Sequence, residues 1–359
     1  MIEIRSIHTQ VIGPSPKEED IMRRSLLAPI VLLGVVALFE FPTDAAQGNA
    51  SNRPSATRTS TRSSLKDRFV GTWKLVDIEQ RNAKGEVIPP ASAPPGNPNR
   101  TGYIIYDPAG YMAVSIMPVG RTKYVGAQPT DNEAKAAITG YAAYFGTFTV
   151  NEAEGTVTHH LEGSLNPGMA PDQKRFFELS GKRLTLKPPP AANGNQSRLT
   201  WERIPDLPNP TAEQRRLFGF FKLVSNERRN ETGELVLSNP GQRGYIIYTP
   251  AGFMMVHMMQ PDRKPYSGAQ PTPEEARQAL RTYTNYFGPF YIHEPDGYVV
   301  HDQVGTVNVG RNGPSPQQRF YQLSGKRLLL KPPPTYTPDG HTVRGTITWE
   351  HVDGDRGTR

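Results

Sequence analysis

The sequence contains no cysteine among its 359 residues. This absence excludes disulfide bonds, thiolate metal sites and a cysteine nucleophile, and it removes the residue on which a bacterial lipoprotein carries its lipid. Several short catalytic motifs are also missing: the Gly-x-Ser-x-Gly elbow, His-Glu-x-x-His, a glycine-rich phosphate loop and a calcium loop. The enzyme classes that depend on these motifs therefore gain no support, and we expect neither a bound metal nor a cofactor.

Long hydrophobic runs are scarce. The run from Leu26 to Phe39 has 14 residues and follows Met22-Arg23-Arg24, so it is short for a membrane span and typical of a signal-peptide core. We expect residues 1–45 to be an upstream extension plus a signal peptide that starts at Met22, and the mature protein to be periplasmic or secreted. An uncleaved anchor is the alternative, because acidic residues lie in the cleavage region.

The net charge of +7 is concentrated near this leader. Residues 46–68 hold five Lys or Arg against one Asp in a Ser/Thr-rich tract, which predicts a disordered tether. The remaining sequence shows no RNA-binding signature and no helix dense in lysine and arginine, so we expect no nucleic-acid partner. Residues 353–359 are expected to form a short tail.

One segment occurs twice. Gly102 to Met112 reads GYIIYDPAGYM, and Gly244 to Met254 reads GYIIYTPAGFM. Each copy has two apolar runs around a Pro-Ala-Gly corner, which is typical of a β-hairpin. The repeat divides the chain into two domains of ordinary size, residues 69–204 and 217–352, joined by a proline-rich linker at 205–216.

Each copy also contains one predicted helix. Thr130 and Thr272 begin capping boxes, apolar residues follow at helical spacing, and Gly146 and Gly288 are expected to end the helices. The rest of each copy reads as eight or nine short strands. Because so many strands need protected edges, we predict a mainly β fold with two tandem antiparallel β-barrels, each with one α-helix.

Strand parity identifies inward-facing candidates for a binding site. His159 shares a face with Val157 and Leu161, whereas its neighbour His160 points to the opposite face, so the pair cannot readily chelate one metal ion. Arg175 is inward by the same reasoning, and the second copy holds His301 and Arg319. An inward arginine beside an inward histidine can hold a carboxylate or enolate, or assist proton transfer. The alternative for the histidine is a hydrogen-bonded core residue.

Two further groups are candidate ligand contacts. Tyrosines on or near the apolar face of the predicted helices are expected either to present hydroxyls to a cavity mouth or to anchor the helix; they are Tyr141, Tyr144, Tyr283 and Tyr286. Met254 and His257 belong to a methionine-rich strand in the second copy, which either lines a ligand site or fills the core.

The order of these motifs resembles the bacterial and fungal lipocalin-like domain family. The motifs are an opening Gly-x-Trp, the repeated hairpin, Tyr-x-x-Tyr-Phe-Gly, Val-x-His-His and Gln-x-Arg-Phe-x-x-Leu. The resemblance implies an eight-stranded barrel with a cavity, and it implies another role for Arg175, since an arginine packs over the opening tryptophan of lipocalins. The second copy departs from the pattern at Phe221 and Asp302, so its cavity need not be equivalent.

Three functions remain open. The first is an exported protein that binds a small hydrophobic or amphipathic molecule in its barrels, with His159, Arg175, His301 and Arg319 as polar contacts. The second, suggested by enzymes that resemble tandem lipocalin-like barrels, is a cofactor-independent cyclase, isomerase or hydratase that uses His159 and His301. The third is an interaction module with filled barrels. No stable membrane insertion is expected after signal cleavage, and the sequence leaves the oligomeric state open.

Overall fold

The structure is a computed structural model that describes residues 64–89, 99–310, 313–337 and 340–352. These residues belong to one compact unit. The predicted signal peptide, most of the predicted tether and the C-terminal tail lie outside the described residues. Within the described part, no helix has the length and hydrophobicity needed to cross a membrane.

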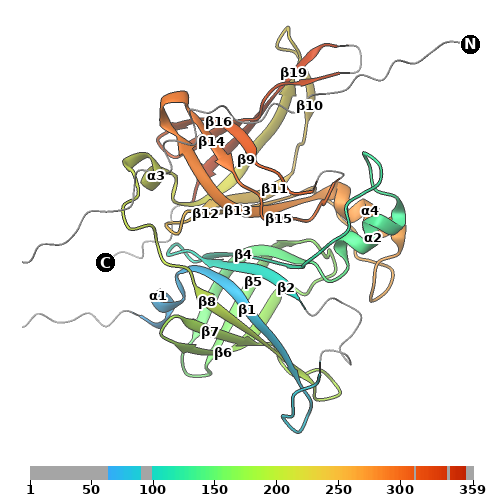
Figure 1. Cartoon of the computed structure of the whole chain (residues 1–359), viewed down its shortest axis with the longest axis vertical. Helices are drawn as coiled ribbons and strands as arrows, with labels where there is room; N and C mark the ends of the chain where they lie inside the picture. The colour runs from blue at the N-terminus through green and yellow to red at the C-terminus, as the bar shows by residue number, and fades with distance from the viewer. Residues whose placement is uncertain (1–63, 90–98, 311–312, 338–339, 353–359) are drawn as a thin grey trace, which may run out of the picture. The chain divides into compact units, whose positions relative to one another are not determined.

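The first domain is a closed antiparallel barrel in which the first strand pairs with the last (Figure 1). A short helix, α1 (Leu65–Phe69), precedes it, and α2 (Asp131–Ile138) connects its third and fourth strands. The strands are β1 (Gly71–Arg81), β2 (Arg100–Tyr106), β3 (Tyr111–Pro118), β4 (Ala142–Asn151), β5 (Thr156–Ser164), β6 (Asp172–Ser180), β7 (Arg183–Lys187) and β8 (Gln196–Arg203).

The second domain repeats this barrel, with closure between β9 and β19. Its wall strands are β9 (Gly219–Arg229), β11 (Arg243–Tyr248), β12 (Phe253–Met259), β13 (Tyr283–His293), β14 (Tyr298–His301), β16 (Gln317–Ser324), β17 (Arg327–Lys331) and β19 (Thr342–His351). Three short strands, β10 (Leu235–Ser238), β15 (Gly305–Thr306) and β18 (Thr335–Tyr336), add to it. Its helices are α3 (Ala212–Leu217), α4 (Pro273–Thr282) and the 3₁₀ turn η2 (Glu294–Asp296). The prediction of two tandem antiparallel barrels is confirmed.

The predicted capping boxes are present, but the helices end earlier than the sequence suggested. Thr130 and Thr272 accept hydrogen bonds from the third residue of α2 and α4. The helices stop at Ile138 and Thr282. Tyr141 lies just before β4, and the other aromatic residues of the predicted stripes lie on β4 and β13. Aromatic side chains three residues apart mimic a helical stripe, but these segments instead pair with two neighbouring strands.

Gly146 and Gly288 therefore do not end helices. Gly146 lies next to a β-bulge where β4 meets β5, and a Cβ atom there would collide with the carbonyl oxygen of His160. Gly288 has the same relation to Asp302 in the second barrel. Both glycines are needed because the strands approach each other closely, not because of a left-handed backbone.

Each barrel has a second, shorter helix that the sequence analysis did not expect. Helix α1 occupies the last residues of the predicted tether, and α3 occupies the last residues of the predicted linker. Helix α1 delivers Phe69, fully buried, against Tyr106 and Phe177 inside the first barrel. Helix α3 delivers the fully buried Leu217 to the core of the second. The aromatic-rich core of each barrel begins at these residues.

In the described part of the chain, three hydrophobic clusters form the core: one inside each barrel and one between the barrels. The outward faces of β3, β4, β12 and β13 pack together in the third cluster, and helices α2 and α4 lie side by side there (Figure 1). In this cluster Phe145 and Phe287 are fully buried. Each barrel wall near this junction is therefore buried on both faces.

We expect Gly146→Ala to destabilise the fold by about 1–3 kcal/mol, because the new methyl group must displace the β5 backbone. The measurement is urea denaturation monitored by circular dichroism. Gly268→Ala is the matched control, since a Cβ atom there meets only ordinary van der Waals contact. If both variants unfold at the same urea concentration as the wild type, the result would contradict the inference that β5 lies too close to Gly146 for a side chain.

Candidate functional site

A histidine held between two tyrosines lies inside the first barrel. His159 on β5 is fully buried; its Nε2 is 2.8 Å from the Tyr106 hydroxyl and its Nδ1 is 3.0 Å from the Tyr144 hydroxyl. Cross-strand pairing explains the arrangement, because Phe148 opposite His159 and Val114 opposite Tyr144 share the inward face. His160, the next residue, points outward and contacts Thr149 and Asp172. The parity prediction for these histidines is confirmed.

The second barrel contains the same arrangement. His301 on β14 is fully buried, with Nε2 at 2.7 Å from the Tyr248 hydroxyl and Nδ1 at 3.1 Å from the Tyr286 hydroxyl. Asp302, which replaces the second histidine of the motif, is not part of this group. The sequence differences between the copies therefore leave the internal cluster unchanged.

Burial determines the electrostatics of both clusters. Desolvation, with smaller contributions from Arg175 and His160, lowers the pKa of His159 to about 3. Burial and the charge of Arg319 hold the pKa of His301 well below its ordinary value. Burial also raises the pKa of Tyr106 well above its ordinary value. Each cluster is consequently neutral near pH 7.

The positive charge of Arg175 lies next to the first cluster. Arg175 lies on the inward face of β6, opposite Val157, and donates hydrogen bonds to the Lys174 carbonyl and the Gln173 side chain. Burial raises the pKa of Tyr144, and the Arg175 guanidinium opposes that rise through its charge and hydrogen bonding. Arg319 has the same relation to Tyr286. The structure therefore brings the predicted arginine and histidine together in both barrels.

The alternative role of Arg175, packing over Trp73, is wrong. Arg203 occupies that place: its guanidinium lies 4.3 Å from the Trp73 ring and donates to the Val70 carbonyl. The reason is strand register, because Arg203 pairs directly with Trp73 between β8 and β1. In the second barrel His351 lies edge-on against Phe221, with 4.9 Å between the ring centroids. Phe221 and His351 thus take the places that Trp73 and Arg203 have in the first barrel.

The interior beside Arg175 is accessible to solvent. Along β6, every inward side chain from Gln173 to Leu179 is half-buried although the strand belongs to a closed wall. The inward side chains of β16 from Gln317 to Leu323 show the same pattern. On the opposite wall, by contrast, Met112 and Val114 of β3 are buried. Water can therefore reach part of each interior, next to the arginine.

Three predicted contacts lie outside the barrel interiors. Tyr141, Tyr283 and His257 belong to the junction between the barrels: the Tyr141 hydroxyl donates to Asn285 Oδ1 at 2.6 Å, and His257 Nδ1 is 2.8 Å from the Tyr283 hydroxyl. The early end of the helices explains this placement, since Tyr144 and Tyr286 turn inward on strands whereas Tyr141 and Tyr283 do not. Met254 is buried within the second barrel core.

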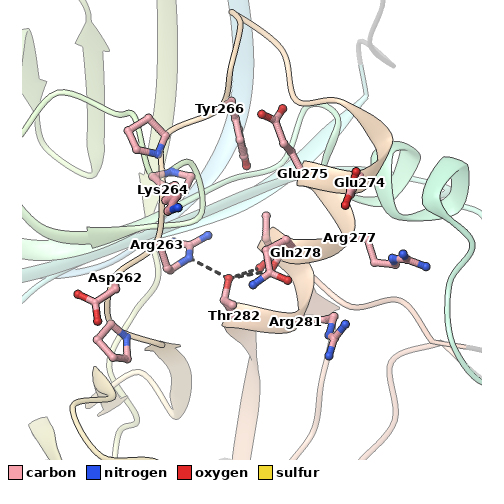
Figure 2. A pocket seen from close by; sticks show the side chains of 14 residues that line it. Asp262, Arg263, Lys264, Tyr266, Glu274, Glu275, Arg277, Gln278, Arg281 and Thr282 are labelled. Carbon is pink, nitrogen blue, oxygen red and sulfur yellow. Dashed lines mark hydrogen bonds between the residues drawn. The ribbon is translucent and has the colours of Figure 1, made fainter.

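The junction also has its own cavities. One of them, about 580 Å³, lies between the loop 261–266 and helix α4 (Figure 2). Several of its charged side chains have structural partners. Arg263 donates hydrogen bonds to the Thr282 hydroxyl and to the carbonyls of Ser164 and Leu165. Arg277 forms an ion pair with Asp131 at 2.8 Å, and Glu275 caps α4. These charges stabilise the junction, so the barrel interiors are the better candidate site.

The family model of the lipocalin-like domain matches residues 70–204 and 218–352. The chain belongs to the lipocalin-like domain family. The matched ranges lie within the two repeat units predicted at 69–204 and 217–352. None of the proteins with curated descriptions matches the chain.

Solved structures resemble the tandem lipocalin-like domains only distantly. A Nostoc punctiforme PCC 73102 protein of unknown function from the DUF3598 family is 11% identical, with 81% of this chain and 100% of that chain covered and a TM-score of 0.21. A putative outer membrane protein from Bacteroides fragilis NCTC 9343 is 9% identical, with 79% and 98% covered and a TM-score of 0.20. A transferrin binding protein B mutant from Haemophilus parasuis Hp5 is 8% identical, with 79% and 76% covered and a TM-score of 0.21. This likeness is too weak to support an argument about function.

Tyr106 and Tyr248 were not among the site residues predicted from the sequence. Each is the last tyrosine of the repeated Gly-Tyr-Ile-Ile-Tyr segment and lies on the inward face of its lipocalin-like barrel. Pairing of this strand with the opening strand places Ile104 opposite Trp73, so Tyr106 shares the inward face of Trp73. The signal was present in the alternation, but it required the strand pairing to be known.

Stability should fall as the pH is lowered from 8 to 5. The folded His159 stays neutral while the unfolded chain takes up a proton near the ordinary histidine pKa of about 6.5, so this residue alone costs about 2 kcal/mol of stability at pH 5. Urea denaturation at several pH values measures how the free energy of unfolding changes with pH. His159→Gln should reduce this slope by the amount that corresponds to about one fewer proton taken up on unfolding. The control Thr158→Val, an outward change on the same strand that removes no titratable group, should keep the wild-type slope. A stability that is flat over this range would contradict the buried neutral histidine.

Proposed function

We propose that the protein is an exported binding protein whose two barrels each take up a small hydrophobic or amphipathic molecule. The observation that carries the proposal is the half-buried inward face of β6 and β16, with Arg175 and Arg319 next to a buried tyrosine–histidine pair. An apolar space with a few convergent polar groups is the usual form of a small-molecule site.

The same geometry favours binding over histidine catalysis. A general base works best when its pKa lies near the working pH, whereas burial lowers the pKa of His159 to about 3. Both ring nitrogens already have tyrosine partners. His159 and His301 therefore act in this proposal by orienting the tyrosines, and Tyr144, Tyr286 and the two arginines contact the ligand.

Export is the second part of the proposal, and it rests on the sequence alone. The apolar run after Met22-Arg23-Arg24 has the length of a signal-peptide core, and the absence of cysteine agrees with an unlipidated mature protein. Expression of the full chain with a cleavage-site determination by mass spectrometry tests it. Cleavage near Ala45 is the expected result, whereas retention of Leu26 to Phe39 in the mature protein would support an uncleaved anchor.

Binding stoichiometry tests the ligand proposal. Leu199 on β8 and Ile347 on β19 are equivalent, inward and half-buried, so a tryptophan at either position fills the accessible space. Native mass spectrometry with decanoate, 1-decanol and decylammonium should show two molecules per wild-type chain, one for Leu199→Trp and none for the double variant Leu199→Trp, Ile347→Trp.

Glu202→Trp is the matched control, because Glu202 lies on the same strand but is exposed on the outer face. It should retain two molecules per chain, and thermal melts should show that all variants fold. If folded wild type binds none of the three amphiphiles, or if the double variant still binds two molecules, the binding proposal is overturned.

A further inference from the structure

Hydrogen counting shows which atom of each cluster is free to bind a ligand. Tyr106, neutral His159 and Tyr144 together carry three polar hydrogens, but the two contacts among them use only two. One hydroxyl hydrogen is left over. It belongs either to Tyr106 or to Tyr144, depending on which ring nitrogen of His159 carries the proton.

The surroundings of the two tyrosines decide between these cases. Tyr106 is almost fully buried between Phe69 and Phe148, and among the described residues its hydroxyl has no partner besides His159. A leftover hydrogen there would be buried without an acceptor, which is costly. The favoured order is therefore Tyr106 donating to Nε2 and Nδ1–H donating to the Tyr144 oxygen. The leftover hydrogen is then on Tyr144, which is also buried but is more exposed than Tyr106 (7% against 1%) and lies beside Arg175.

Other observations also show an excess of donors in the barrels. The indole nitrogens of Trp201 and Trp349, at equivalent inward positions, are buried without a hydrogen-bond partner among the described residues. On the described strands no Asp or Glu occupies an inward position, as the pairing registers show. The positive charge of Arg175 or Arg319 therefore has no carboxylate counterion inside its barrel wall.

We infer that each barrel selects ligands with a carboxylate head group, which accepts hydrogen bonds from the free tyrosine hydroxyl and from the arginine of that barrel. A carboxylate accepts hydrogen bonds only, and its charge complements the guanidinium. In the second barrel Tyr286 and Arg319 supply these donors, with Tyr248 and His301 behind them. The inference rests on the proposed binding function and narrows its ligand class.

Matched amphiphiles test the inference. Isothermal titration calorimetry at pH 7 should show decanoate binding about 10- to 100-fold more tightly than 1-decanol, as expected for hydrogen bonds to a charged group, and decylammonium binding most weakly. In the double variant Arg175→Met, Arg319→Met, decanoate should lose this advantage while 1-decanol binds as before. Tyr144→Phe with Tyr286→Phe should weaken decanoate in the same direction.

Arg183→Met is the control, because Arg183 is exposed on the outer face of β7; it should keep the preference for decanoate. A ¹⁵N NMR measurement of the histidine tautomer gives an independent readout: protonation of His159 at Nδ1 is expected, and protonation at Nε2 would overturn the hydrogen order. Equal binding of all three amphiphiles would overturn the carboxylate inference and leave the binding function intact, whereas binding of none would overturn the function itself.

Discussion

Closure of each sheet is the constraint on which the other features depend. Pairing of β1 with β8, and of β9 with β19, leaves no free edge in the barrel wall. Every wall strand then has one inward and one outward face, so residue parity decides which side chains point inward, and strand register decides which of them meet. His159, Tyr106 and Tyr144 come from three different strands, and they touch only because the wall is closed and its registers are fixed.

The histidine at the centre of each barrel is neutral because it is buried. Desolvation is the largest cause of its lowered pKa, and a neutral imidazole donates one hydrogen bond and accepts another. In the first barrel, the histidine can therefore connect the buried Tyr106 to Tyr144, which lies beside the solvent-accessible part of the interior. The arginine of the next strand adds charge at the accessible end, so the polar character of the site is concentrated where a ligand can reach it.

The two copies have diverged in different places than the sequence suggested. The departures at Phe221 and Asp302 leave the internal clusters alike, and the change from Trp73 to Phe221 accompanies the change from Arg203 to His351. The copies differ in chemistry at their junction, where His257 replaces Ser115 and Asn285 replaces Ala143. Ser115 and Tyr141 of the first barrel both donate to Asn285 of the second. The copies therefore differ both at their junction and at the tryptophan–arginine pair of the first barrel.

The sequence alone determined the repeat, the barrel architecture, the helix starts and the inward direction of His159, Arg175, His301 and Arg319, because periodicity and capping are local properties of the chain. It misplaced the helix ends and the role of Gly146, because three-residue spacing of aromatic residues is compatible with a helix or a bulged strand until the partner strands are known. Only the tertiary structure separated Tyr144 from Tyr141 and added Tyr106 to the site. The physical reason is that contacts between distant strands depend on register, and register is fixed by the packing of the whole barrel.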